Sequence, residues 1–103
     1  MPDNKVRHQQ KVIISGAEVR NVKTLADLTA LGLDQPRGVL IVSIPAQSTL
    51  SQYGFTNDDV ILSINGQKVT EANLANVLAS LKATGNSAEI WRGQNDAQLE
   101  FDR

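Results

Sequence analysis

The spacing of apolar residues along the chain predicts two main helices. The stretch from Thr70 to Gly85 carries apolar residues at i, i+3, i+4 and i+7, which places them on one helical face. Thr70 is its expected N-cap and Gly85 its expected end. The stretch from Thr24 to Leu33 carries a similar stripe and is capped by Thr24 and ended by Gly32. The stripe of the first helix consists of Leu74, Val77, Leu78 and Leu81.

Runs of β-branched and alternating residues predict short strands between and around these helices. Residues 39–44 are almost continuously apolar, as expected for a strand that is covered on both faces. Asn65-Gly66 is the strongest hairpin signal in the chain. A short helix over 46–55, capped by Ser48 and ended by Gly54, separates two of the strands. The predicted strands lie within residues 11–15, 17–22, 39–44, 59–64, 67–69, 87–93 and 97–103.

Composition narrows the class of protein without naming a function. The 103 residues suit one α+β domain, and ten basic against eleven acidic residues leave a net charge of -1. That charge provides no field to attract nucleic acid or an anionic membrane. No apolar run approaches the roughly 20 residues of a membrane helix, so no membrane insertion is expected. Residues 1–10 are expected to be a flexible tail before a single domain over 11–103, cut from a larger protein.

The candidate chemistry of the chain is sparse. Asp58 and Asp59 are adjacent, and neighbours on a strand point to opposite faces, so they are interpreted as turn residues. His8 is the only histidine, and the chain has no cysteine. We therefore expect no catalytic residue, no metal and no cofactor. Trp91 is expected to cover the edge of a small core.

The order of these segments resembles a known family. The stretch "GVLIVSI" (38–44), the stretch "DVILSING" (59–66) and the helix "NLANVLASLKATG" (73–85) resemble a bacterial PDZ domain. The style is that of the periplasmic high-temperature-requirement (HtrA) serine proteases and related processing proteins. The resemblance covers roughly residues 14–101. It implies a partly open antiparallel barrel or sandwich of five or six strands with two main helices, and it includes no protease residues. It also implies that Asp58 takes the left-handed backbone of a tight turn and that the Asp59 carboxylate accepts turn N–H bonds.

The resemblance implies a protein-interaction module that captures an extended or C-terminal peptide by strand addition. The groove would lie between the strand Ile14–Arg20 and the helix Asn73–Lys82. The carboxylate-binding loop would be 14–17, with backbone N–H groups as donors. Leu74 and Leu78 would line the groove and Leu81 would close the pocket, while Val77 and Leu81 face mainly inward. The implied peptide-binding residues are Ile14, Ser15, Gly16, Ala17, Glu18, Val19, Leu74, Leu78 and Leu81.

Two alternatives accompany this interpretation. In the first, a shifted register places 11–14 in the loop, which restores apolar walls but loses the glycine of the preferred Gly16 register. In the second, the module is a structural appendage that packs on a neighbouring protease or glycan-active domain and binds no free peptide. Ser15 and Ala17 favour the appendage, because they are polar or small where pocket walls are expected. Through the resemblance, the expected compartment is periplasmic or extracellular. The expected partner is a peptide, a protein C-terminus or a neighbouring domain, and not nucleic acid.

Overall fold

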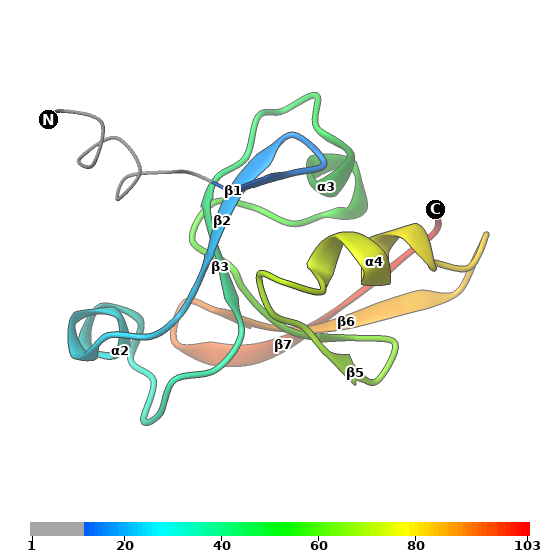
Figure 1. Ribbon diagram of the computed structural model, residues 1–103. Coiled ribbons are helices and arrows are strands. Elements are labelled where there is room, and N and C mark those ends of the chain that lie inside the picture. Colours follow the sequence, from blue (N-terminus) through cyan, green and yellow to red (C-terminus); the bar gives the residue numbers. More distant parts are fainter. Residues whose placement is uncertain (1–11) are drawn as a thin grey trace, which may run out of the picture.

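The computed structural model describes residues 12–103, which form one antiparallel sheet and three helices (Figure 1). The sheet order is β1-β2-β3-β4-β6-β7, and β5 pairs with β4 outside this path. The strands are β1 (Val12–Ile14), β2 (Ala17–Asn21), β3 (Val39–Ser43), β4 (Val60–Ile64), β5 (Gln67–Lys68), β6 (Asn86–Arg92) and β7 (Asn95–Phe101). The helices are α2 (Leu25–Leu31), α3 (Thr49–Tyr53) and α4 (Leu74–Ala79).

The predicted α+β class and antiparallel sheet are confirmed. The sheet has seven strands instead of five or six, because the very short strands β1 and β5 both pair with a neighbour. The predicted tail over 1–10, with His8, lies outside the described residues. In Figure 1, α2 projects at one end of the sheet, whereas α3 and α4 lie toward the other.

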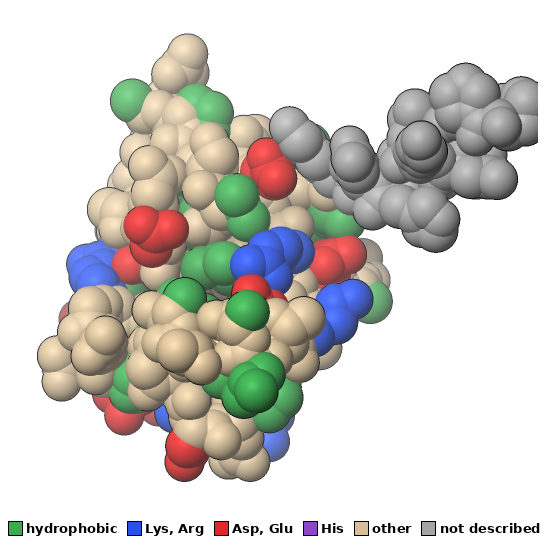
Figure 2. All heavy atoms as spheres, turned by 90° about the vertical axis from the view of Figure 1, so that its left-hand side faces the viewer, with side chains coloured by type: hydrophobic (Ala, Val, Ile, Leu, Met, Phe, Trp, Pro, Cys, Tyr) green, Lys and Arg blue, Asp and Glu red, His purple; other side chains and the backbone are tan. Residues whose placement is uncertain are grey.

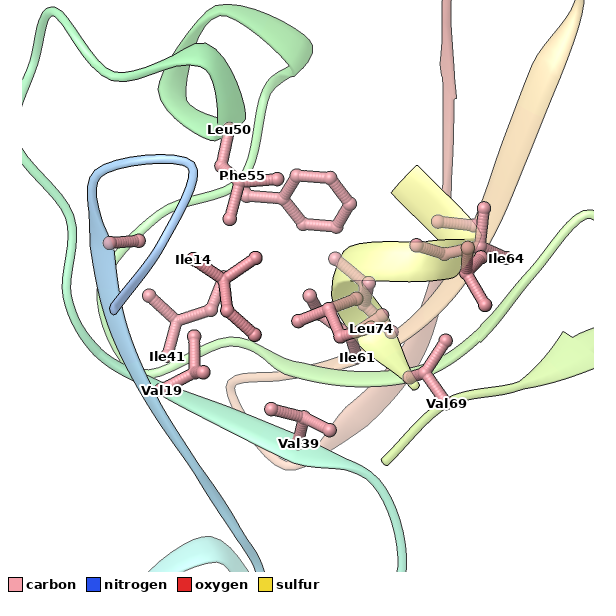
Figure 3. Close-up of a cluster of buried hydrophobic side chains, with 14 of the residues drawn as sticks. Ile14, Val19, Val39, Ile41, Leu50, Phe55, Ile61, Ile64, Val69 and Leu74 are labelled. Atoms are coloured by element: carbon pink, nitrogen blue, oxygen red, sulfur yellow. The ribbon is translucent and has the colours of Figure 1, made fainter. Parts of the chain in front are cut away.

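Two apolar clusters hold these elements together. The larger cluster joins β1, β2, β3 and β4 to α3 and α4, and Figure 3 shows its side chains converging on one interior space. Ile14 and Leu74 both point into that space. The smaller cluster lies under α2 and is built on Val22, Leu33, Leu40 and Val60, with Trp91 packed against it. The Trp91 indole N–H donates to the Leu31 carbonyl at 2.7 Å, so Trp91 covers a core edge as predicted.

Local capping follows the sequence at α2 and α3. Thr24 caps α2 through a reciprocal capping box with Asp27, and Gly32 ends the helix with a left-handed φ of 76°. The Ser48 hydroxyl accepts from the Ser51 N–H at the start of α3. Gly54 ends that helix with a φ of 108°. Both helices therefore begin and end where short-range chemistry predicts.

Helix α4 is shorter than predicted at both ends. Its N-cap is Asn73 and not Thr70, because Thr70 and Asn73 exchange hydrogen bonds and form a separate turn. Its C-cap is Ser80 and not Gly85. Beyond it, the buried Asn86 side chain accepts from the Lys82 N–H at 2.9 Å and donates to the Lys82 carbonyl at 2.9 Å. These bonds occupy backbone groups that a longer helix would use internally.

Candidate peptide-binding groove

Strand β1 forms one end of the sheet and is joined to β2 by a two-residue turn. Ser15 and Gly16 both have positive φ, 52° and 86°, and Ile14 pairs with Ala17. This is the geometry of a type I′ hairpin. The predicted carboxylate-binding loop over 14–17 is therefore a tight turn that reverses the chain. Within the described part of the chain, β1 pairs only with β2, so its other edge is open.

The backbone of Ile13 points toward that open edge. In a two-residue hairpin the residue before the turn directs its C=O to the partner strand, so Ile14 faces β2. Backbone groups of successive strand residues point to opposite sides, so the N–H and C=O of Ile13 face away from β2. Side chains alternate as well: Ile14 is buried in the core, whereas 59% of the Ile13 surface is exposed.

A cavity of about 410 Å³ lies between this end of the sheet and the helices α3 and α4. None of the side chains that line it carries a formal charge at neutral pH. Three lining residues are in β1 and its turn, two in α3 and three in α4. They are Ile13, Ile14, Ser15, Thr49, Tyr53, Ala75, Leu78 and Ala79. Such a lining favours the binding of apolar ligand side chains. The only polar side-chain groups that it offers to a ligand are hydroxyl groups.

The structure brings three of the predicted site residues to this cavity, namely Ile14, Ser15 and Leu78. Leu74 is fully buried in the core, which contradicts its predicted place on the groove wall. Val77 and Leu81 face inward as predicted, and Leu81, at 5% exposure, contributes to the core and not to the cavity lining. The remaining predicted residues, Gly16, Ala17, Glu18 and Val19, lie in the turn and β2 and do not line the cavity.

The predicted ligand-pairing strand Ile14–Arg20 is wrong, because both edges of β2 are occupied. β3 pairs with β2 on one side. On the other, β1 covers its first residues, and at its last residue the Asn21 N–H donates to the Glu71 carboxylate at 2.9 Å. The Glu71 N–H donates back to the Asn21 side chain at 2.8 Å. The open edge belongs to β1, within the alternative 11–14 register, of which Lys11 lies outside the described residues.

Sequence reasoning missed five of the cavity residues, namely Ile13, Thr49, Tyr53, Ala75 and Ala79. A weak signal existed for four of them. Thr49 and Tyr53 stand at i and i+4 of α3, and Ala75 and Ala79 stand at i and i+4 of α4, so each pair shares a helical face. The sequence contained no such signal for Ile13. Its exposed position follows from the alternation of side chains along β1, which becomes clear only once the β1–β2 hairpin is known.

The Asp59 carboxylate fixes the end of α3 beside the cavity. Asp59 is 1% exposed and accepts from Arg92 at 2.8 and 2.6 Å and from the Thr56 N–H at 2.9 Å, which confirms its predicted turn bond. Arg92 also donates to the Gly54 carbonyl at 3.0 Å. The hydrogen bond with Asp59 raises the pKa of the Arg92 guanidinium. Asp58 has the predicted left-handed backbone, with φ 70°.

A second Arg–Asp pair lies at the α2 end of the molecule. Arg20 contacts the Asp27 carboxylate at 2.8 and 2.7 Å. The hydrogen bond from Arg20 holds the pKa of Asp27 well below its ordinary value, and backbone N–H groups of Lys23 and Thr24 add to the effect against the cost of burial. Every hydrogen-bonding oxygen of Asp27 is thus used within the fold. The pair borders a hollow of about 420 Å³.

A larger hollow of about 770 Å³ lies over β4 and β5, and it is lined by charges of both signs, including Arg37, Lys68, Glu89 and Asp96. Figure 2 shows acidic and basic side chains mixed on the face at the α2 end, without a broad region of one sign. No group of three or more metal-ligating side chains occurs among residues 12–103. No helix in that range is long and apolar enough to span a membrane. The β1 cavity differs from these two hollows because its lining contains no formally charged side chain.

Comparisons with known proteins agree with the fold. No protein-family model matches the chain. A curated relative, a probable periplasmic serine endoprotease DegP-like from Pseudomonas putida (strain W619), is 33% identical over 81 residues. That match spans 78% of this chain but only 16% of the relative.

Two solved structures are similar to the chain. One is the HtrA3 PDZ domain bound to a phage-derived ligand (FGRWV), with a TM-score of 0.64, 17% identity, and coverage of 90% of this chain and 84% of that one. The other is the HtrA-type protease AlgW with a decapeptide, with a TM-score of 0.65, 20% identity, and coverage of 97% of this chain and 31% of that one. The chain has the fold of a PDZ domain of the HtrA type.

Proposed function

We propose that the chain binds extended peptide segments, above all free C-termini, by adding them as a strand to the open edge of β1. The observation that carries this proposal is the uncharged cavity between that edge and α4. The Ile13 N–H and C=O offer backbone hydrogen bonds at the edge, and Leu78 forms the apolar wall on the helix. Backbone pairing would supply affinity, and the cavity would select an apolar side chain.

The direction of the ligand follows from the strand. A peptide that pairs antiparallel with β1 has its C-terminus near the beginning of β1, so its terminal carboxylate would lie near Val12. Its preceding residues would extend toward Ser15 and α3. A cavity of about 410 Å³ falls within the ~300–1,000 Å³ range of ordinary ligand pockets, so it accommodates a large side chain.

The relatives suggest the setting of this binding. The two similar structures carry a phage-derived ligand and a decapeptide, and the curated relative is described as periplasmic. We place this chain in the periplasm, as a non-catalytic module of a larger protein, with a peptide tail as its partner. Packing on a parent domain is the second candidate, although no contact among the described residues favours it.

The test is a titration of fluorescein-labelled peptides, read by fluorescence polarisation. The panel contains Phe-Gly-Arg-Trp-Val and a set with randomised apolar C-termini, each with a free or an amidated terminus. We expect saturable binding that weakens at least about tenfold on amidation, because the amide removes a charge-assisted hydrogen-bond acceptor. Absence of binding across the whole panel would contradict the proposal and favour the structural appendage.

A matched pair of variants locates the site. Leu78→Lys places a charge on the cavity wall and should reduce affinity more than about tenfold, because a buried charge lacks a partner there. Asn76→Lys adds the same charge to an exposed position of α4 that does not line the cavity, and should leave affinity unchanged. Equal losses in both variants would place the peptide elsewhere.

Hydrogen exchange distinguishes addition to β1 from replacement of β1. With saturating peptide, the Ile13 amide should become protected while the β2 amides paired with β1 keep their protection. Faster exchange at Ala17 and Val19 would mean that the peptide displaces β1 from β2, which contradicts the proposed strand order.

A further inference from the structure

The hollow over β4 and β5 is, at about 770 Å³, larger than the other two cavities described above, and the peptide binding proposed for β1 makes no use of it. It lies on the face of the sheet that points away from the larger apolar cluster. Glu89, in its lining, alternates along β6 with Ala88 and Ile90, which are buried in that cluster. The sheet therefore separates this hollow from α4, which packs on the same cluster.

The cations and the anions that line this hollow stand on opposite sides of β4. β6 pairs with β4 along Val60–Ile64, so β3 and β5, which pair with residues of the same stretch, share the other edge of β4. Lys68 belongs to β5 and Arg37 lies two residues before β3, and these two residues form a positive wall. Glu89 belongs to β6 and Asp96 to β7 beyond it, and these two form a negative wall. Strand β4 is the floor between the walls.

The two walls are matched along the direction of the strands. Lys68 and Glu89 pair with the same residue of β4 from its two sides. Asp96 pairs with Trp91, whose ring centroid lies 5.6 Å from the guanidinium carbon of Arg37. Glu89 and Trp91 are two residues apart on β6, which corresponds to roughly 7 Å along a strand. The hollow thus presents a cation and an anion at each of two levels.

The walls are held in place but have no ion-pair partner within the described chain. Gly38, next to Arg37, has a φ of 82°, and a Cβ there would lie only 2.6 Å from the Val60 side chain, so the loop contacts β4 closely. On the other wall, the Glu89 carboxylate accepts from the Ser63 hydroxyl at 2.8 Å. The two ion pairs formed by residues 12–103 involve none of the four wall residues.

We propose that this hollow is a second binding site, which takes an extended segment of a partner protein with alternating acidic and basic residues. Successive side chains of an extended chain point to opposite sides, and residues i and i+2 are ~7 Å apart. Acidic residues at i and i+2 would therefore face the positive wall, while basic residues at i+1 and i+3 face the negative wall. A free amino acid carries both charges on one carbon atom, so it cannot reach both levels.

The test compares two hexapeptides of equal composition and no net charge, both acetylated and amidated so that neither offers a terminal carboxylate to β1. One is Glu-Lys-Glu-Lys-Glu-Lys and the other is Glu-Glu-Glu-Lys-Lys-Lys. Each is titrated into the ¹⁵N-labelled chain at about 20 mM NaCl, where exposed charges are weakly screened, and backbone amide chemical shifts are followed. The two peptides differ only in the order of their charges.

The alternating peptide should shift the amide signals of Lys68, Glu89 and Asp96 in a saturable manner. It should bind about fivefold more tightly than the block peptide, because the block peptide places like charges against both walls. Raising NaCl to about 500 mM should abolish the shifts. Equal affinity for the two peptides would indicate unspecific charge attraction and overturn the inference.

A matched pair of variants locates this second site. Lys68→Gln removes one charge of the positive wall and should weaken binding of the alternating peptide about threefold. Lys23→Gln should bind as the wild type does, because Lys23 is also exposed but lines none of the three cavities. Thermal unfolding midpoints establish that both variants are folded. Equal losses in the two variants would overturn the inference.

Two further outcomes separate this inference from the function proposed for β1. Shifts confined to β1 and α4 would place the alternating peptide in the β1 cavity and overturn the second site, while the proposed function would stand. The absence of shifts with either peptide would also overturn the second site alone, because neither peptide has the free C-terminus that the β1 edge is proposed to bind.

Discussion

Strands β1 and β7 are the two ends of the same sheet, yet they are built in opposite ways. β7 is long, and its outward residues Asp96, Gln98 and Glu100 are polar and exposed. β1 is three residues long, has Ile13 on its exposed face and borders an uncharged cavity. Charged residues on an edge discourage pairing with another chain, whereas a short apolar edge beside a cavity permits it within a confined length.

Helix α3 connects these two edges. Tyr53 stacks on Phe101 of β7 with ring centroids 4.6 Å apart, and it also lines the β1 cavity with Thr49. The carbonyl of Gly54, at the end of α3, is bound by Arg92, which pairs with Asp59. Through α3, strand β7 thus supports one wall of the cavity beside β1.

Removing the carboxylate at Asp59 should have the largest effect. Asp59→Ala deletes three charge-assisted or backbone hydrogen bonds and should lower the free energy of unfolding by about 3 kcal/mol. Urea denaturation measures the change. Because α3 loses its anchor, peptide affinity should fall as well. A loss below about 1 kcal/mol would show that the pair contributes no more than an exposed ion pair.

A proline substitution on the outer edge of β1 and another on that of β7 compare directly how much each edge contributes to peptide binding. Ile13→Pro removes an N–H that faces the open edge of β1, where proline is tolerated in a strand, and should weaken peptide binding at least about tenfold. Gln98→Pro is the matched change on β7, where the hairpin register Arg92↔Asn95 directs the Gln98 N–H outward. Its peptide affinity should match that of the wild type. Equal losses would remove the functional distinction between the edges.

The Arg20–Asp27 pair offers a control that does not line the β1 cavity. Asp27→Asn should lower the free energy of unfolding at pH 7 by about 1–2 kcal/mol, because it weakens the α2 cap and the ion pair. The lowered pKa of Asp27 means that its stabilisation is present above the ordinary value of 3.8 and is lost as pH falls below it. Urea midpoints of the two proteins should therefore converge from pH 7 to pH 2.5, and peptide affinity at pH 7 should be unchanged.

Making β7 apolar should have the smallest effect. Gln98→Ile gives this long edge an exposed β-branched residue, and weak self-association should appear in sedimentation velocity at high protein concentration. Ile13→Thr, which makes the edge of β1 more polar, should not increase self-association. A monomeric Gln98→Ile protein would indicate that the remaining charges of β7 suffice to prevent pairing.

Short-range chemistry was enough to predict most elements of the fold. Helix boundaries depend on contacts within one or two turns of the chain, so capping residues define them independently of the tertiary structure. In α2 and α3 these residues are Thr24 with Asp27, Gly32, Ser48 and Gly54. Asp58 and Asp59 were correctly assigned to a turn for the same reason. The order of these local signals also carried the resemblance to a PDZ domain, which the fold confirms.

The position of the groove required long-range contacts. Ser15 has the left-handed φ of a hairpin turn because β1 folds back on β2, and this pairing moved the open edge from β2 to β1. Glu71, 50 residues from Asn21, occupies the last free N–H of β2. Asn86 ends α4 early, and Leu74, whose periodicity allows either face, is drawn into the core. Periodicity defines a face of an element, but only packing decides what that face meets.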